Sequence, residues 1–172
     1  MFHVKHSAGR NPPREWDSDR LYAYGLRFLG YRARSELEIR QRFQQRAAAP
    51  ELIDEVIARL RSAGLVDDES FARAWVDSRR RASPRGDRLL KYELVRKGIP
   101  AETIENTLAK TEDGSDLELA HKAATQRARR LSGVPEPAFS RRLTDFLIRR
   151  GFDYDVVATV VAQVRPAGDG SD

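Results

Sequence analysis

Arginine is the residue type through which this sequence is best equipped to act on another molecule. Only five of the 31 basic residues are lysine, so 26 are arginine, and the chain carries a net charge of +5. The guanidinium group is planar and always charged, so it binds phosphate and carboxylate groups through paired hydrogen bonds. The charge indicates a nucleic acid or an acidic protein surface as partner, without choosing between them. A GC-rich genome, whose codons favour arginine, is an alternative source of the bias.

The basic residues gather in two stretches, Arg73 to Lys97 and Lys122 to Arg150, each with six more basic than acidic residues. We predict that these stretches contact an anionic partner, although solvated helix faces with no partner are the alternative. Asp77 lies between Arg73 and Arg80 on the same predicted helix and is able to pair with either. The candidate contact residues are Arg73, Arg79, Arg80, Arg81, Arg85, Arg88, Lys122, Arg129 and Arg130.

Residue patterns for catalysis or metal binding are poor. The chain has no cysteine, and two of its three histidines precede residue 15, which leaves His121. Gly-rich phosphate loops, zinc-binding helices and calcium-binding loops are not found in the sequence. Phe71 and Trp75 are suited to stacking on bases, but one helical turn apart they are more typical of a core. We therefore expect a protein that is not an enzyme and uses no cofactor or metal.

Hydrophobic periodicity indicates that the basic stretches lie on helices. Charged residues make up 33% of the chain and hydrophobic residues 40%, as in well-solvated helical proteins. No apolar run approaches the ~20 residues that cross a bilayer. The default expectation is a soluble, cytoplasmic, all-α protein with no membrane contact.

The helical pattern repeats three times. Shifting the chain by 51 residues, and then by a further 53, superposes apolar positions and the turn residues Ala47, Gly98 and Gly151. This periodicity predicts three stacked three-helix units, because each unit buries its apolar stripe against its neighbours. The turn at Ala47, which lacks a glycine, is expected to be looser. The matching apolar sets are Ile39, Leu90 and Leu143; Phe43, Leu94 and Leu147; and Ile53, Ile104 and Val157.

The predicted organisation follows from this period. In the third unit, Ser115 and Glu118 are expected to form a capping box, with Leu117, Ala120 and Ala124 on the buried stripe. Stacked units align like helices, so we also predict a basic ridge and an acidic ridge. The predicted segments are a disordered tail (1–15), three-helix repeats (16–66, 67–113 and 114–165) and a second disordered tail (166–172).

Three stretches resemble the RecX family of bacterial proteins that modulate the RecA recombinase. The most specific is Gly64-Leu65-Val66-Asp67-Asp68-Glu69-Ser70-Phe71-Ala72, followed by Trp75-Val76 and Ser78-Arg79. The other two are Arg34-Ser35-Glu36-Leu37 and Leu94-Val95-Arg96-Lys97-Gly98-Ile99, with a third-unit echo at Leu147 to Phe152.

The resemblance implies a curved array of three-helix repeats without catalytic activity. It also implies a protein that binds along the groove of the RecA–DNA filament and most often inhibits its strand-exchange, ATPase and coprotease activities. RecA is then the main partner, contact with single- or double-stranded DNA is weak and non-specific, and we expect a monomer. Two alternatives stay open: a general DNA-binding helical protein of the helix-turn-helix type, and a repeat scaffold that binds an acidic protein without DNA.

Overall fold

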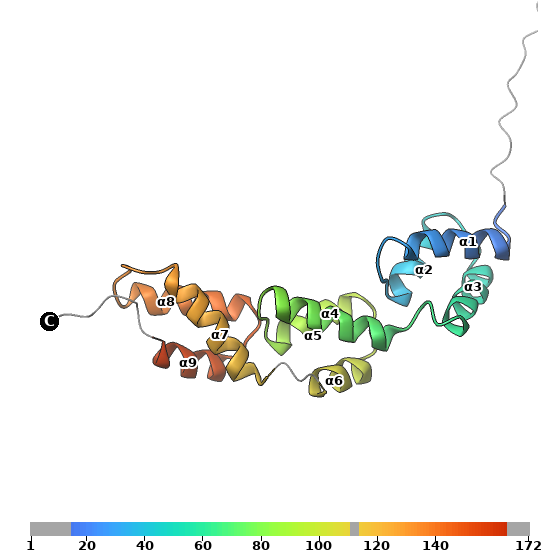
Figure 1. Cartoon of the computed structure of the whole chain (residues 1–172). Helices are drawn as coiled ribbons and strands as arrows, with labels where there is room; N and C mark the ends of the chain where they lie inside the picture. Colours follow the sequence, from blue (N-terminus) through green and yellow to red (C-terminus); the bar gives the residue numbers. More distant parts are fainter. Residues whose placement is uncertain (1–14, 111–113, 165–172) are drawn as a thin grey trace, which may run out of the picture. The chain divides into compact units, whose positions relative to one another are not determined.

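The computed structural model describes residues 15–110 and 114–164, and within them it contains nine helices and no strand (Figure 1). The prediction of an all-α fold built from three-helix repeats is confirmed. The predicted disordered tails lie outside the described residues, except for Glu15. The helices are α1 (Ser18–Leu29), α2 (Glu36–Gln44), α3 (Pro50–Ser62), α4 (Asp68–Ala82), α5 (Asp87–Arg96), α6 (Ala101–Ala109), α7 (Asp116–Arg129), α8 (Ala138–Arg149) and α9 (Tyr154–Gln163).

Each group of three helices buries its own apolar core. The cores of the first, second and third repeats are built from residues 21–66, 71–108 and 119–160. The equivalent positions Ile39, Leu90 and Leu143 are all fully buried. The same holds for the next set along the middle helix, Phe43, Leu94 and Leu147. The period read from the sequence is therefore the period of the core. The prediction that each repeat buries its apolar stripe against its neighbours is wrong, because the stripe is buried among the three helices of the same repeat.

The turn after each middle helix has the same backbone conformation in all three repeats. Gly98 and Gly151 have φ values of 78° and 87°, and Ala47 has 56°. After each of them, the next amide donates back to the fifth-preceding carbonyl, as Ala48 N does to Phe43 O at 3.3 Å. The expectation of a looser turn at Ala47 is wrong, because alanine adopts the left-handed conformation there despite its steric cost.

The first helix of the third repeat, α7, follows the sequence prediction only in part. Ser115 and Glu118 form the predicted capping box at the start of α7. However, Leu117 is 43% exposed, whereas Leu119 and Ala123 are buried. The predicted position of Leu117 on the buried stripe is therefore wrong, because an alanine-rich helix offers little contrast between its faces.

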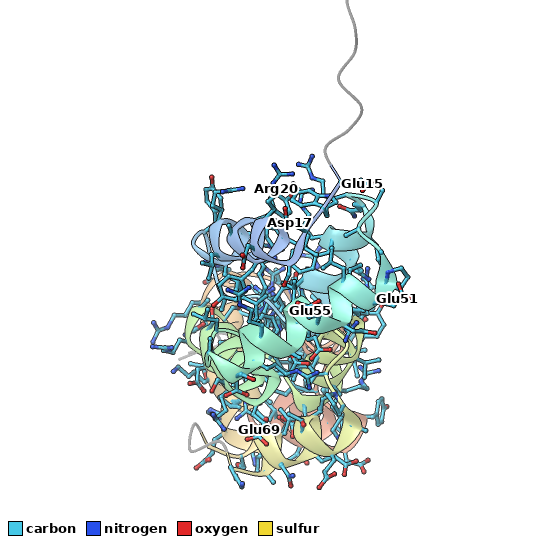
Figure 2. All side chains as sticks on the ribbon, turned by 90° about the vertical axis from the view of Figure 1, so that its right-hand side faces the viewer. Glu15, Asp17, Arg20, Glu51, Glu55 and Glu69 are labelled. Carbon is cyan, nitrogen blue, oxygen red and sulfur yellow. The ribbon has the colours of Figure 1, made fainter. Side chains whose placement is uncertain are left out.

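Two compact units divide the described residues. Those before Asp67 form the first unit, except Ser35–Leu37, which group with the residues from Asp67 onward in the second. In the first unit, acidic side chains stand at the start of α1 and along α3, where Figure 2 labels Asp17, Glu51 and Glu55. Ser18 Oγ donates to Glu55 Oε1 at 2.6 Å, which ties α1 to α3.

The second and third repeats meet within the second unit, backbone against backbone. Gly86 N donates to Arg150 O at 3.0 Å. A Cβ atom at Gly86 would lie 2.4 Å from Gly151 O, and one at Gly151 would lie 2.3 Å from Leu89 Cβ. Only glycine permits this approach, so the pair Gly86 and Gly151 sets the joint between these two repeats.

Candidate interaction surface

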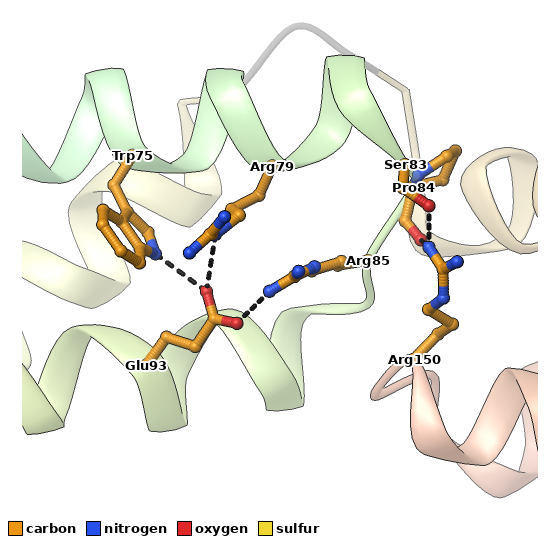
Figure 3. Close-up of polar contacts among 7 residues, drawn as sticks. All are labelled: Trp75, Arg79, Ser83, Pro84, Arg85, Glu93 and Arg150. Atoms are coloured by element: carbon orange, nitrogen blue, oxygen red, sulfur yellow. Dashed lines mark hydrogen bonds and ion pairs between the residues drawn. The ribbon is translucent and has the colours of Figure 1, made fainter.

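Glu93 on α5 forms ion pairs with two of the predicted contact arginines, Arg79 and Arg85. Figure 3 shows the carboxylate between Trp75, Arg79 and Arg85. Trp75 Nε1 donates to Oε2 at 2.8 Å and Arg79 Nε donates to the same oxygen at 3.2 Å. Arg85 Nη1 donates to Oε1. The Glu93 side chain is only 18% exposed, so Arg79 and Arg85 serve first to neutralise an internal carboxylate.

Trp75 is part of the same cluster. The Arg79 guanidinium lies 4.2 Å from the centre of its indole ring, and the ring stacks on Phe71 at a centroid distance of 5.7 Å. Phe71 is 6% exposed and Trp75 packs against the core of the second repeat. The prediction that these two aromatics belong to the core is confirmed.

Arg80 lies in the interior, against the expectation that it faces a partner. Its side chain is 4% exposed, and Nη2 donates to Asp87 Oδ1 at 2.7 Å. Its position on α4 is buried because it follows Val76 by one turn on the core-facing side. Arg80 therefore leaves the set of candidate contact residues and becomes a link between α4 and α5.

The remaining α4 arginines lie on the exposed side of the helix. Arg73 pairs with Glu69 at 3.5 Å and Arg81 Nε donates to the backbone oxygen of Asp77 at 3.2 Å. The pairing of the Asp77 carboxylate with Arg73 or Arg80 that the sequence allows is not formed, because each of the two pairs with a different acidic residue. Exposed ion pairs of this kind contribute about 0–1 kcal/mol, so Arg73 can exchange Glu69 for another anion.

Arg88 and Arg150 bridge the second and third repeats. Arg88 Nη2 donates to Ile148 O in the last turn of α8 at 3.0 Å. Arg150 Nη1 donates to Ser83 Oγ, and to Pro84 O at 3.4 Å (Figure 3). Burial, together with the neighbouring Arg85, lowers the pKa of the Arg150 guanidinium. Arg88 is exposed all the same, so it belongs both to the joint and to the surface.

The predicted cations of the third repeat are exposed. Lys122 and Arg129 lie on the solvent side of α7 with Gln126, and Arg130 follows at the C-cap. No acidic residue occurs between Lys122 and Arg130, so this strip keeps its positive charge.

The contact residues predicted from sequence include only one residue of a second basic surface, which is formed by the exposed cations of α5 and α8. The residues on the outer face of α5 are three cations and two apolar residues, and the two acids of this helix, Asp87 and Glu93, are paired with arginines. On α8 the exposed residues are three arginines and Asp145. On α6 and α9, which are the last helices of the second and third repeats, no exposed residue is basic. We define the cationic face as Arg88, Lys91 and Arg96 of α5 together with Arg141, Arg142 and Arg149 of α8.

The helical period itself contained the signal for this face. Arg88, Lys91, Tyr92, Val95 and Arg96 follow the spacing i, i+3, i+4, i+7, i+8. They lie opposite the buried pair Leu90 and Leu94, so they share the outer face of α5. The contact between Arg88 and Ile148 places Arg88 of α5 beside the last turn of α8, which carries Arg149.

Asp116 is the acidic counterpart at the joint. Desolvation and the nearby Asp87 carboxylate raise the pKa of Asp116 to about 6. Its Oδ2 accepts from Asp87 N at 3.4 Å, and its Oδ1 is buried with no hydrogen-bond partner among the described residues. The structure therefore bears an electrostatic cost here whenever this carboxylate is ionised.

Within the described residues there is neither a metal-binding cluster nor a membrane-spanning helix. Over residues 15–110 and 114–164, no three histidine or acidic side chains converge in a way that suits a metal ion. His121 is exposed on α7. None of the described helices combines the length and apolar character needed to span a bilayer.

Comparison with known proteins supports the assignment of the three repeats. Models of the first, second and third three-helix domains of RecX match residues 22–60, 67–108 and 115–161. A "Regulatory protein RecX" from Chlorobium limicola is 35% identical over 146 residues, which are 85% of this chain and 90% of that protein. The chain belongs to the RecX family.

Further relatives and a solved structure agree with this family assignment. The RecX regulatory protein of Mycobacterium sp. strain KMS is 37% identical over 155 residues, covering 88% of this chain and 84% of the relative. The chain spans about half of the Geobacillus thermodenitrificans relative, 53%, at 34% identity. The crystal structure of RecX from Lactobacillus salivarius has a TM-score of 0.73 at 23% identity, over 85% of this chain and 95% of that one, which shows the same fold.

Proposed function

We propose that this RecX-family protein regulates the RecA recombinase by binding along the RecA–DNA filament, and that its effect is inhibitory. The family membership supports a regulatory role. The observation that supports an anionic binding partner is the outer face of α5, which carries only cations and apolar residues because both acids of the helix are paired with arginines. A filament that contains DNA offers phosphates and acidic side chains to such a surface.

The contact surface in this proposal has two parts. The first is the cationic face of α5 and α8. The second is the exposed set from the sequence prediction on α4 and α7, which comprises Arg73, Arg81, Lys122, Arg129 and Arg130. Arg79, Arg80 and Arg85 pair with Glu93 and Asp87 of α5, which stabilises the second repeat. The protein acts as a monomer in the cytoplasm, without catalysis or a cofactor.

The test is ATP hydrolysis by RecA on single-stranded DNA with this protein added at well below one copy per RecA. Inhibition by filament binding predicts a fall in the hydrolysis rate at these ratios, since one bound copy affects several protomers. A rate that stays unchanged up to equimolar protein contradicts the proposal.

A second candidate function is general DNA binding without RecA, and the exposed cations of α5, α7 and α8 favour it. It is distinguished by the dependence of affinity on sequence. Tight binding to a particular duplex site, with no effect on RecA hydrolysis, supports the second candidate; weak, sequence-independent binding supports the first.

A further inference from the structure

An exposed tyrosine lies in the middle of the cationic face. Tyr92 is 59% exposed, and its neighbours on the outer side of α5 are Arg88, Lys91, Val95 and Arg96. The Arg96 guanidinium lies 5.7 Å from the centre of the tyrosine ring, on the next turn of the helix. A basic path interrupted by an accessible aromatic ring is the arrangement by which proteins bind single-stranded nucleic acids.

The ring is held in place by the core beneath it. Leu90 and Leu94 are fully buried, so α5 cannot rotate about its axis without exposing them. Tyr92 is therefore held outward, and its two side-chain torsions leave little freedom to lose on binding. Val95 is 62% exposed beside it and extends the apolar surface on which a base can rest.

The equivalent helix position of the other repeats does not carry this ring. The position equivalent to Tyr92 is Gln41 in the first repeat and Asp145 in the third, by the same shifts of 51 and 53 residues. Tyr154 on α9 is more exposed, at 72%, but lies between Asp153 and Asp155 on a helix with no exposed cation. It lacks the charge that would hold a phosphate backbone nearby, which makes it a matched control.

We propose that Tyr92 is a base-stacking platform for single-stranded DNA, with Arg88, Lys91 and Arg96 holding the flanking phosphates. In a duplex the bases are stacked on one another and offer no free face, so the single strand is the form that fits. An acidic peptide would satisfy the cations but has no need of an exposed ring among them. The choice of DNA rather than RNA rests on the proposed function; the stacking itself does not.

The length of the basic path fits a polymer better than a short ligand. At 1.5 Å per residue, the 10 residues of α5 extend about 15 Å and the 12 residues of α8 about 18 Å. The two helices meet at the joint through Arg88, whose guanidinium donates to Ile148 O beside Arg149. A strand that stacks one base on Tyr92 can continue past Arg88 to Arg149, in the last turn of α8.

The experiment measures fluorescence anisotropy of a labelled oligothymidylate of about 20 nucleotides at low salt, without RecA. Tyr92→Ala should weaken binding about 5- to 150-fold, the loss expected for one stacked base, and Tyr92→Phe should restore it. Tyr154→Ala should leave binding unchanged. Thermal unfolding of each variant shows whether the fold is kept.

An abasic oligonucleotide of the same length separates stacking from charge. It offers the same phosphates without bases, so Tyr92→Ala should bind it as the wild type does. Equal losses on both oligonucleotides, no loss on oligothymidylate, or no binding by the wild type overturns the proposal. Poly-glutamate at equal charge is the competitor that represents an acidic protein. If it displaces oligothymidylate, and Tyr92→Ala changes the binding of neither ligand, the cationic face is assigned to an acidic protein instead.

The salt dependence tests the role of the cations. Each phosphate contact contributes about −0.7 to the slope of log K against log salt for single strands, so Lys91→Gln should make the slope less negative by about that amount. Lys110→Gln, an exposed lysine beyond α6, is the control and should not change it. Because RecA is absent, these results stand whether or not RecA hydrolysis responds to the protein.

Discussion

The two basic stretches, Arg73 to Lys97 in the second repeat and Lys122 to Arg150 in the third, contain equal excesses of basic residues but use them differently. In the second repeat, Arg79, Arg80 and Arg85 are bound to Glu93 and Asp87 between α4 and α5. In the third, Arg129, Arg141 and Arg142 are exposed on α7 and α8. Arginine clustering in a sequence therefore does not measure surface charge. The third repeat leaves most of its charge exposed, whereas the second uses part of its own in ion pairs within the fold.

The first unit shows another structural use of arginine. The Arg34 guanidinium lies 4.2 Å from the ring centre of Phe28, and that of Arg59 lies 4.1 Å from that of Tyr22. Planar cations stack well on aromatic faces, which lysine does less effectively. Part of the strong preference for arginine over lysine is thus explained within the fold.

Removing Arg80 should have the largest effect on stability. Arg80→Ala leaves Asp87 without its partner and opens a buried position, so we expect the free energy of unfolding in urea to fall by about 3 kcal/mol. Arg129→Ala, on the exposed side of α7, is the comparison and should change it by no more than about 0.5 kcal/mol. Equal effects of the two substitutions would contradict the distinction between arginines that stabilise the second repeat and arginines that are only exposed on the third.

Removing the charge of Glu93 should have a smaller effect. Glu93→Gln keeps an oxygen for Trp75 Nε1 but leaves Arg79 and Arg85 without a counter-charge, so we expect a loss of about 2 kcal/mol. Trp75 is one of only two tryptophans, so a Trp16→Phe background makes its fluorescence report the second repeat alone. Asp145→Asn, an exposed acid on α8, should leave the unfolding midpoint where it is. A Glu93→Gln midpoint equally unmoved would show that the cluster is not needed for folding.

Neutralising Asp116 should stabilise the protein, by the smallest amount of the three. Its pKa is raised to about 6 in the fold from the ordinary aspartate value of 3.8. The folded state therefore holds a proton that the unfolded state has lost between these values, and the free energy of unfolding falls as pH rises from about 4 to about 6.

Asp116→Asn removes that decline. We expect the variant to be more stable than the wild type by about 1 kcal/mol at pH 7.5, a figure reduced because the carboxyl is partly solvated, and equal to it near pH 4. Unfolding midpoints in urea at the two pH values measure this difference. A variant less stable at pH 7.5 would mean that the hydrogen bond to Asp87 N outweighs the desolvation of Asp116.

The repeats and their cores followed directly from the sequence, because a three-helix unit must bury the same positions each time it recurs. Ile39, Leu90 and Leu143 illustrate this, and so does the turn residue that follows them by eight positions. The stripe on α7 was misplaced because alanines lie on several of its sides.

The interaction surface was less predictable. Ion pairs between helices depend on helix packing, so the partners of Arg79 and Arg80, 14 and seven residues away, were not evident. Asp77 is nearer in sequence, but its carboxylate pairs with neither Arg73 nor Arg80. The face of α5 was in principle readable, since once Leu90 and Leu94 are assigned to the core, Lys91, Tyr92 and Arg96 must lie outside.

The most direct test of the division between structural and exposed cations is the affinity of labelled protein for RecA–single-stranded DNA filaments. The variant Arg141→Glu/Arg142→Glu reverses two charges of the cationic face, and Arg27→Glu/Lys110→Glu reverses two exposed charges elsewhere. We predict at least a tenfold loss of affinity for the first, little change for the second, and the wild-type unfolding midpoint for both. Unchanged filament affinity in the first variant, or equal losses in the two, would contradict the account.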